Sequence, residues 1–160
     1  MYFKNDKSYT LNEATKKLEH YCAYQERCHK EVVSKLSNMG MIPDAINQIV
    51  AHLIQENYLN EERFSRSFAR GKFRIKKWGK NRITAELKLR NISKYNIRAA
   101  LTEIDEDEYL FTFNELAEKK LTEIQEKQPQ KRKKKLVDFL FYRGWESHLV
   151  YDKANELIKN

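Results

Sequence analysis

Four residues of types that ligate metals lie within ten positions of each other: His20, Cys22, Cys28 and His29. On a helix, positions 20 and 22 point about 200° apart, and the spacing matches no structural zinc pattern. We therefore expect no metal site here, with Cys22 packed in the core and His29 on the surface. The sequence also has no glycine-rich phosphate loop, HExxH motif or nucleophile elbow. It predicts neither a catalytic site nor a cofactor.

Cysteine content and the start of the chain indicate where the protein works. Two cysteines are too few for a disulfide framework, which fits a reducing compartment. The first eight residues are polar, and no stretch approaches eighteen consecutive apolar residues. We expect a cytoplasmic, monomeric protein that makes no membrane contact.

Charge is the strongest chemical signal in the sequence. The chain has 31 basic and 23 acidic residues, a formal net charge of +8, which favours anionic partners such as nucleic acid. Eleven basic residues lie between Arg70 and Arg98, with Glu86 as the one acidic residue among them. By contrast, residues 103–108 hold five acids, which we interpret as a solvated linker or an intramolecular partner for the basic residues.

Two basic sets are the candidate binding residues. The first is Arg74, Lys76, Lys77, Lys80, Arg82, Lys88 and Arg90, and the second is Lys131, Arg132, Lys133, Lys134 and Lys135. Both sets include residues at the predicted start of a helix, where positive charge opposes the macrodipole, so a binding role would explain them. The alternative is a solvated lysine-rich surface kept for solubility.

Aromatic residues interleave with the first basic set. Phe73, Trp78 and Tyr95 stand among these cations, a composition typical of surfaces that stack on bases or grip phosphates. We expect Phe73 to belong to the core instead. Trp78 could contact a ligand or plug the space between helices, and we favour the plug.

An internal repeat indicates the architecture that carries these residues. Segments anchored on Gly40, Asn91 and Gly144 align without gaps, with periods of 51 and 53 residues. Apolar residues recur at equivalent helical positions around each anchor: Val32, Ile83 and Leu136; Leu36, Leu87 and Leu140; Ile46, Ile97 and Val150; Leu53, Ile104 and Leu157. Each anchor suits the left-handed residue that follows a helix, so the pattern predicts helix, tight turn, helix.

A further helix is expected before each of these pairs. Its apolar residues are Ala14, Leu18 and Tyr21 in the first repeat, Phe64 and Phe68 in the second, and Leu116 and Leu121 in the third. Helix starts are predicted at Thr10, which has Glu13 three residues on, at Asn60, at Pro43 and at Ser93.

The predicted fold is all-α, with three tandem three-helix repeats stacked into a short elongated, curved solenoid. We expect a flexible N-terminus at 1–8 and repeats at 9–58, 59–107 and 108–160. The middle repeat is the most basic of the three.

Several motifs resemble the RecX family of bacterial recombinase regulators. They are the run from Tyr58 to Phe64, Ser67-Phe68, the run from Gly79 to Ile83, and Glu86-Leu87. The first repeat adds Ala14, Leu18, Tyr21, Arg27, Lys35-Leu36 and Gly40, so the resemblance covers about Leu11 to Ile158. Asn91 departs from the glycine usual in the family, and the third repeat is the least similar.

The resemblance implies a function that composition and spacing do not. Such a protein lies in the groove of the RecA nucleoprotein filament and suppresses ATPase, strand-exchange and coprotease activities, within homologous recombination, DNA repair and the SOS response. Its expected partners are the RecA filament and single-stranded DNA, with double-stranded DNA as a further candidate. The alternative is a sequence-nonspecific DNA-binding protein that acts without the recombinase, and the basic middle repeat supports that reading.

Overall fold

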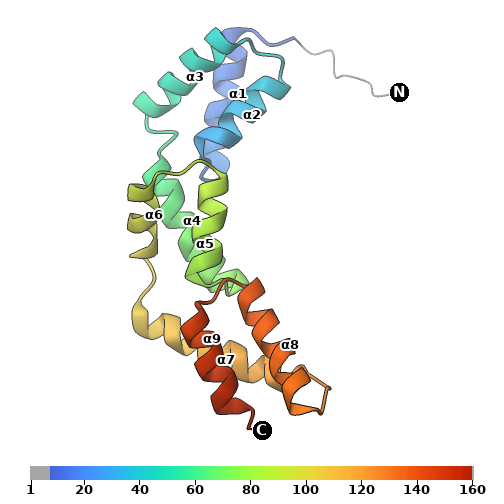
Figure 1. The fold of residues 1–160 in the computed structure, drawn as a ribbon. Coiled ribbons are helices and arrows are strands. Elements are labelled where there is room, and N and C mark those ends of the chain that lie inside the picture. The colour runs from blue at the N-terminus through green and yellow to red at the C-terminus, as the bar shows by residue number, and fades with distance from the viewer. Residues whose placement is uncertain (1–7, 160) are drawn as a thin grey trace, which may run out of the picture. The chain divides into compact units, whose positions relative to one another are not determined.

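The computed structural model describes residues 8–159, and within them all regular structure is helical. The predicted flexible segment 1–8 lies, apart from Ser8, outside the described residues. The helices are α1 (Leu11–Tyr24), α2 (His29–Asn38), α3 (Pro43–Gln55), α4 (Glu61–Lys76), α5 (Lys80–Leu89), α6 (Lys94–Leu101), α7 (Glu106–Glu123), α8 (Pro129–Tyr142) and α9 (Ser147–Leu157) (Figure 1). The predicted all-α class with three three-helix repeats is confirmed, and the elongated curvature stays a prediction.

Local sequence signals explain the helix boundaries. Thr10 accepts a hydrogen bond from the backbone N–H of Glu13, whose carboxylate accepts from the N–H of Thr10, so the predicted capping box is present. Asn60 and Ser93 accept from the backbone N–H groups of Arg63 and Asn96, at 2.9 and 3.1 Å. These side chains satisfy N–H groups that have no partner inside their helices.

The three repeat anchors adopt the left-handed backbone predicted for them. Their φ angles are 81° at Gly40, 59° at Asn91 and 89° at Gly144. At the first anchor, the N–H of Gly40 donates to Ser37 and that of Met41 to Leu36, which is the Schellman pattern. Asparagine therefore keeps the left-handed backbone in the second repeat, because it tolerates positive φ better than most residues.

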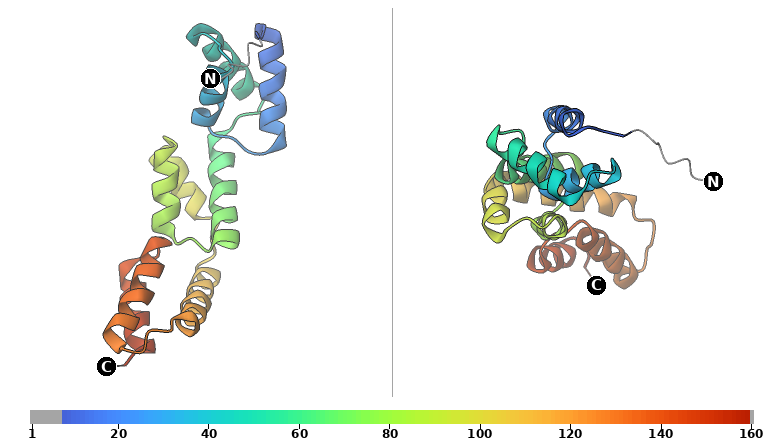
Figure 2. Two further views of the ribbon diagram at one scale, coloured as in Figure 1. Left: turned by 90° about the vertical axis from the view of Figure 1, so that its right-hand side faces the viewer. Right: turned by 90° about the horizontal axis from the view of Figure 1, so that it is seen from above.

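The chain divides into two compact units. The first holds residues 8–64 with 90–92, and the second holds 65–89 with 93–159. In the first unit, α1, α2 and α3 surround a core whose fully buried members are Ala14, Leu18, Val32, Leu36, Ile49 and Leu53. In the second unit, α8 and α9 lie side by side, as both views of Figure 2 show.

The buried residues follow the predicted stripe with exceptions in each repeat, and Tyr21 and Phe68 in the first two repeats are only partly buried. Ile83, Leu87, Leu136 and Leu140 are fully buried, as predicted. In α7, however, the buried face is Tyr109, Phe113 and Ala117 at four-residue spacing, whereas Leu116 and Leu121 are only partly buried. At the end of α9, Ile158 is buried and Leu157 is not. In α7 the prediction was wrong because Tyr109 packs against Phe73 and Trp145, which are distant from it in sequence.

Candidate functional site

Lys76 and Lys77 lie where α4 ends and the chain turns toward α5. The helix ends because Lys77 adopts a left-handed conformation with φ of 57°, after which the N–H of Trp78 donates to the carbonyl of Lys72. Both lysine side chains are exposed, and among residues 8–159 neither has a carboxylate in ion-pair range. They are therefore open to an anionic partner.

Arg74 and Lys88 are also exposed, on α4 and α5. The Nε atom of Arg74 lies 3.8 Å from a carboxylate oxygen of Glu108, a loose pair in which the arginine side chain keeps 60% of its surface exposed. Exposed pairs of this kind contribute about 1 kcal/mol or less. Arg74 can therefore exchange this partner for an external anion at small cost.

Lys80 has a structural role that the sequence did not predict. Its backbone N–H donates to the hydroxyl of Tyr109 at 2.9 Å, and its Nζ donates to Glu106 at 3.0 Å. The same ammonium lies 4.5 Å from the centroid of the Tyr109 ring. The second and third repeats are joined through this lysine, so Lys80 has packing contacts in addition to the binding role predicted for it.

Arg82 also lies in this junction, the region where the second and third repeats pack against each other. Its guanidinium lies 4.2 Å from the ring centroid of Trp78 and 4.6 Å from that of Tyr142, and it donates to the carbonyl of Tyr142 at 3.0 Å. Such cation–π contacts stabilise by about 0.5–1 kcal/mol at exposed sites. Arg82 is thus a packing residue as well as a cation. Trp78 lies between Phe68 on α4 and Arg82 on α5, so it packs between helices as predicted.

The second basic set occupies the first turns of α8. Because successive helical residues are rotated by about 100°, five consecutive cations surround the helix and do not form one face. Arg132 donates to the carbonyl of Leu121 at 3.3 Å, and Lys133 donates to the side chain of Asn155 at 3.0 Å. Lys134 is paired with Asp138 at 2.7 Å. Exposed Lys131 and Lys135, one turn apart, point to the same side.

The two basic sets are not brought together into one cluster. Tyr142, which contacts Arg82, is at the far end of α8 from Lys131, a separation of about 16 Å along the helix at 1.5 Å per residue. Arg90, grouped with the first set from sequence, belongs to the first unit, where its Nε lies 3.9 Å from Glu31. The structure therefore offers separate basic surfaces.

The acidic segment 103–108 pairs with basic residues of the second repeat. Glu103 accepts from Arg66 at 2.9 Å and lies 3.2 Å from Arg70. The hydrogen bond from Arg66 is the main reason that the pKa of Glu103 is lowered. Asp105 caps α7 by accepting from the N–H of Glu108. Of the two interpretations of this segment, the intramolecular partner is confirmed.

Trp145 is the main junction residue that the sequence interpretation missed. It is fully buried against the rings of Tyr109 and Phe113, and its Nε1–H donates to the carbonyl of Lys77 at 3.2 Å. The hydroxyl of Tyr109 donates to Glu146 in turn, and burial raises the pKa of Tyr109 far above its usual range. The one sequence signal was a tryptophan directly after an anchor glycine.

Cys22 is packed in the core as predicted, and Cys28 is buried as well. Both are free thiols. Burial raises the pKa of Cys22, and raises that of Cys28 to about 11. His29 lies at the surface, 3.4 Å from Glu61. Across residues 8–159, no group of three His, Cys, Asp or Glu side chains is arranged to hold a metal ion, and no helix is long and apolar enough to span a membrane.

Family models match the second and third repeats. The family described as "RecX, second three-helix domain" matches residues 60–101, and "RecX, third three-helix domain" matches residues 106–153. Together these matches cover more than half of the chain.

Curated relatives carry the same family name. The chain is 32% identical over 117 residues to a "Regulatory protein RecX" of Yersinia enterocolitica, covering 73% of this chain and 68% of that relative. It is 29% identical over 135 residues to one from Clostridium perfringens, covering 83% of this chain and 61% of the relative. The chain spans only 33% of a Lactobacillus johnsonii relative, with 32% identity over 90 residues. It thus covers less than two thirds of two of these relatives.

Solved structures share the fold. The chain superposes with a TM-score of 0.80 on a structure described as "Crystal structure of regulatory protein RecX", at 21% identity, covering 93% of this chain and 72% of that one. RecX from Lactobacillus salivarius superposes with a TM-score of 0.77 at 22% identity, covering 92% and 96% of the two chains. At this identity the likeness is one of fold.

Proposed function

Because the chain belongs to the RecX family of regulatory proteins, we propose that it binds the RecA–DNA nucleoprotein filament and suppresses its ATPase, strand-exchange and coprotease activities. The proposed activity is binding and not catalysis. It would act as a monomer in the cytoplasm, within homologous recombination, DNA repair and the SOS response. Relatives named as regulatory proteins support the regulatory part of this proposal.

The observation that carries the proposed contact is the exposed basic turn after α4. Lys76 and Lys77 extend from this turn, with Arg74 and Lys88 exposed on the flanking helices. A filament with DNA at its axis presents phosphates and acidic side chains, for which exposed ammonium groups supply attraction at long range. Lys80 and Arg82 contribute charge beside this turn while they also hold the second and third repeats together.

The second basic set would supply a separate contact. Lys131, Lys134 and Lys135 are exposed on the first turns of α8, and Lys134 is held by an exposed ion pair with Asp138. Exposed pairs are weak, so an external phosphate could displace Asp138 at little cost. We propose that this helix start meets the filament apart from the α4–α5 turn.

The test is the rate of ATP hydrolysis by RecA on single-stranded DNA, with the protein added well below the amount that would saturate the DNA. Inhibition at these amounts supports a filament-directed regulator, since competition for bare DNA would need near-saturating protein. Unchanged hydrolysis at every substoichiometric amount would refute the proposal.

A second candidate function is sequence-nonspecific binding of DNA without the recombinase. The exposed cations of the α4–α5 turn favour it, because phosphate contacts alone supply such binding. The same titration separates the two. Inhibition that appears only as the DNA becomes saturated, and that is relieved in proportion by added DNA, would favour the second function.

A further inference from the structure

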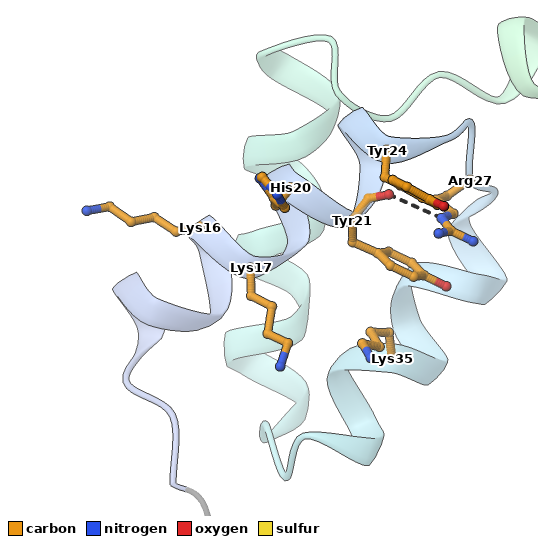
Figure 3. A pocket seen from close by; sticks show the side chains of 7 residues that line it. All are labelled: Lys16, Lys17, His20, Tyr21, Tyr24, Arg27 and Lys35. Carbon is orange, nitrogen blue, oxygen red and sulfur yellow. Dashed lines mark hydrogen bonds between the residues drawn. The ribbon is translucent and has the colours of Figure 1, made fainter.

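A hollow on the first unit brings basic and aromatic side chains together outside both predicted basic sets. It has a volume of about 610 Å³, which is within the range of about 300–1,000 Å³ typical of ligand pockets. Its lining comes from α1, from the loop after it and from α2, and consists of Lys16, Lys17, His20, Tyr21, Tyr24, Arg27 and Lys35 (Figure 3).

The position of these residues follows from the helical periodicity of α1. Its buried stripe is Ala14, Leu18 and Cys22, which faces the core of the first unit. Lys17, Tyr21 and Tyr24 follow at spacings of four and three residues, so they form a neighbouring face of the same helix. Tyr21 is only partly buried, and Tyr24 keeps 82% of its surface exposed. An aromatic face is thus presented to solvent beside the core.

Arg27 is fixed at this face before any ligand arrives. Its guanidinium lies 3.7 Å from the centroid of the Tyr21 ring, and its Nε donates to the carbonyl of Tyr21 at 3.2 Å. A loose pair with Glu31 at 3.9 Å also holds it, and only 14% of its side chain is exposed. In Figure 3 a dashed line marks the hydrogen bond between Arg27 and Tyr21. Such pre-organisation lowers the entropy lost on binding.

The charge of the hollow is positive. Four cations line it, and no carboxylate does. Lys35 lies 5.7 Å from the centroid of the Tyr21 ring, while Lys17 donates to the hydroxyl of Tyr9 at 3.0 Å. Lysine stems also cover apolar surface while their ammonium groups stay in water. An anionic ligand with a flat apolar part fits this lining.

We propose that this hollow binds single-stranded nucleic acid, with a base stacked on the Tyr24 face and the neighbouring phosphates on Lys17 and Lys35. Exposed aromatic rings beside arginine and lysine are the surfaces on which unpaired bases stack, whatever their sequence. A duplex keeps its bases stacked on each other and offers only phosphates to such a face. An acidic peptide offers charge without a flat ring. The combination of Tyr24 with the lysines therefore favours the single strand over both.

The experiment measures binding of the full chain to a labelled oligothymidylate in the absence of any recombinase, across a series of salt concentrations. Tyr24→Ala should weaken binding about tenfold, equivalent to about 1.4 kcal/mol, and leave the salt slope unchanged. Lys17→Gln with Lys35→Gln should reduce that slope by about 1.4, at roughly 0.7 for each phosphate contact on a single strand. Tyr24→Phe keeps the ring and should keep the affinity.

Matched controls change the same chemistry elsewhere. Phe111→Ala removes an aromatic ring that is 62% exposed on α7, outside both basic sets, and Lys119→Gln with Lys159→Gln removes two exposed lysines of the second unit. The aromatic control should not weaken binding as Tyr24→Ala does, and the lysine control should not reduce the salt slope as Lys17→Gln with Lys35→Gln does. Photocrosslinking of bound oligothymidylate should label the peptide that contains Tyr24.

Three outcomes would overturn the proposal: full affinity in Tyr24→Ala, equal loss in the control variants, or tighter binding of a duplex or an acidic peptide than of the single strand. Because no recombinase is present, the result is independent of the proposed regulation of RecA. Circular dichroism checks that each variant is folded, which is expected since Tyr24 is exposed.

Discussion

The backbone N–H of Gly79 donates a hydrogen bond of 2.8 Å to the carbonyl oxygen of Arg143, 64 positions later in the chain. A Cβ at position 79 would overlap the carbonyl of Gly144 and lie 2.7 Å from the Cα of Trp145. A Cβ at Gly144 would likewise overlap the backbone of Arg82. Two glycines thus allow the backbones of the second and third repeats to touch directly, which places Lys80 and Arg82 in the junction.

Gly79→Ala should destabilise the protein by about 1–3 kcal/mol, because the added methyl group meets backbone atoms that cannot rotate away. Denaturant unfolding at constant m-value measures the loss. Gly71→Ala is the matched control. Nothing lies within 4 Å of its added Cβ, and Gly71 is inside α4, so this variant should gain about 0.5–1 kcal/mol. Equal stability of the two variants would contradict the close approach at Gly79.

Trp145→Phe should cost about 1–3 kcal/mol. It leaves the carbonyl of Lys77 without its indole donor and removes part of a fully buried ring system. Trp78→Phe is the comparison, because Trp78 is only partly buried, and its loss should be smaller. Thermal unfolding of both variants gives the order, and a larger loss at Trp78 would show that the junction is assigned to the wrong tryptophan.

Arg82→Gln should lower the free energy of unfolding by about 1–2 kcal/mol, since it removes the bond to the Tyr142 carbonyl and contacts with two aromatic rings. Lys76→Gln, at an exposed position, should stay within about 0.5 kcal/mol of the parent chain. Charge changes at Lys76 and Lys77 are therefore the cleaner probes of the proposed filament binding. If Arg82→Gln unfolds at the same denaturant concentration as the parent, the guanidinium is not structural.

Helix ends and buried stripes were predictable because their causes are local. The left-handed turns at Gly40, Asn91 and Gly144 depend on residue type and on the helix immediately before them. By contrast, the roles of Lys80 and Arg82 depend on partners 29 and 60 positions away, Tyr109 and Tyr142. Periodicity carries no information on such partners, so the sequence predicted both residues as candidate binding cations and did not predict their packing contacts.

For the candidate sites too, local features could be predicted and features that depend on packing could not. Composition identified the basic second repeat, and the exposure of Lys76 and Lys77 agrees with that expectation. The hollow of the first unit was missed because Arg27 and Lys35 join the tyrosine face of α1 only once the loop and α2 pack beside it. Tyr21 was predicted as an apolar residue of the first helix, and the structure shows that its partly buried ring packs against the core and also carries Arg27.

Cys28 should make stability fall with rising pH in the alkaline range. Burial raises the pKa of its thiol from 9.0 to about 11, so the native state keeps a proton that the unfolded chain loses first. Stability is therefore lost between about pH 9 and pH 11 and is constant with respect to this group above that window. The free energy of unfolding of Cys28→Ala is measured over the same pH range and subtracted. The difference isolates the contribution of the thiol from that of tyrosines that titrate in the same range. A flat difference across the window would show that the thiol ionises freely in the native state.

Replacing Glu106 and Glu108 together by glutamine should strengthen binding of anionic partners to the second repeat. Glu106 pairs with Lys80 at 3.0 Å and Glu108 lies 3.8 Å from Arg74, so both carboxylates compete with an external phosphate for these cations. Their carboxylates are exposed, and exposed pairs contribute about 1 kcal/mol or less, so the fold should lose little stability. Affinity for the RecA–DNA filament at low salt should rise severalfold, and the gain should shrink as salt screens the added charge. The matched control is Glu115→Gln with Glu123→Gln, which makes the same charge change on the same helix away from Lys80 and Arg74. If both pairs raise affinity equally, the effect comes from net charge alone; if neither does, the cations beside the α4–α5 turn do not contact the filament.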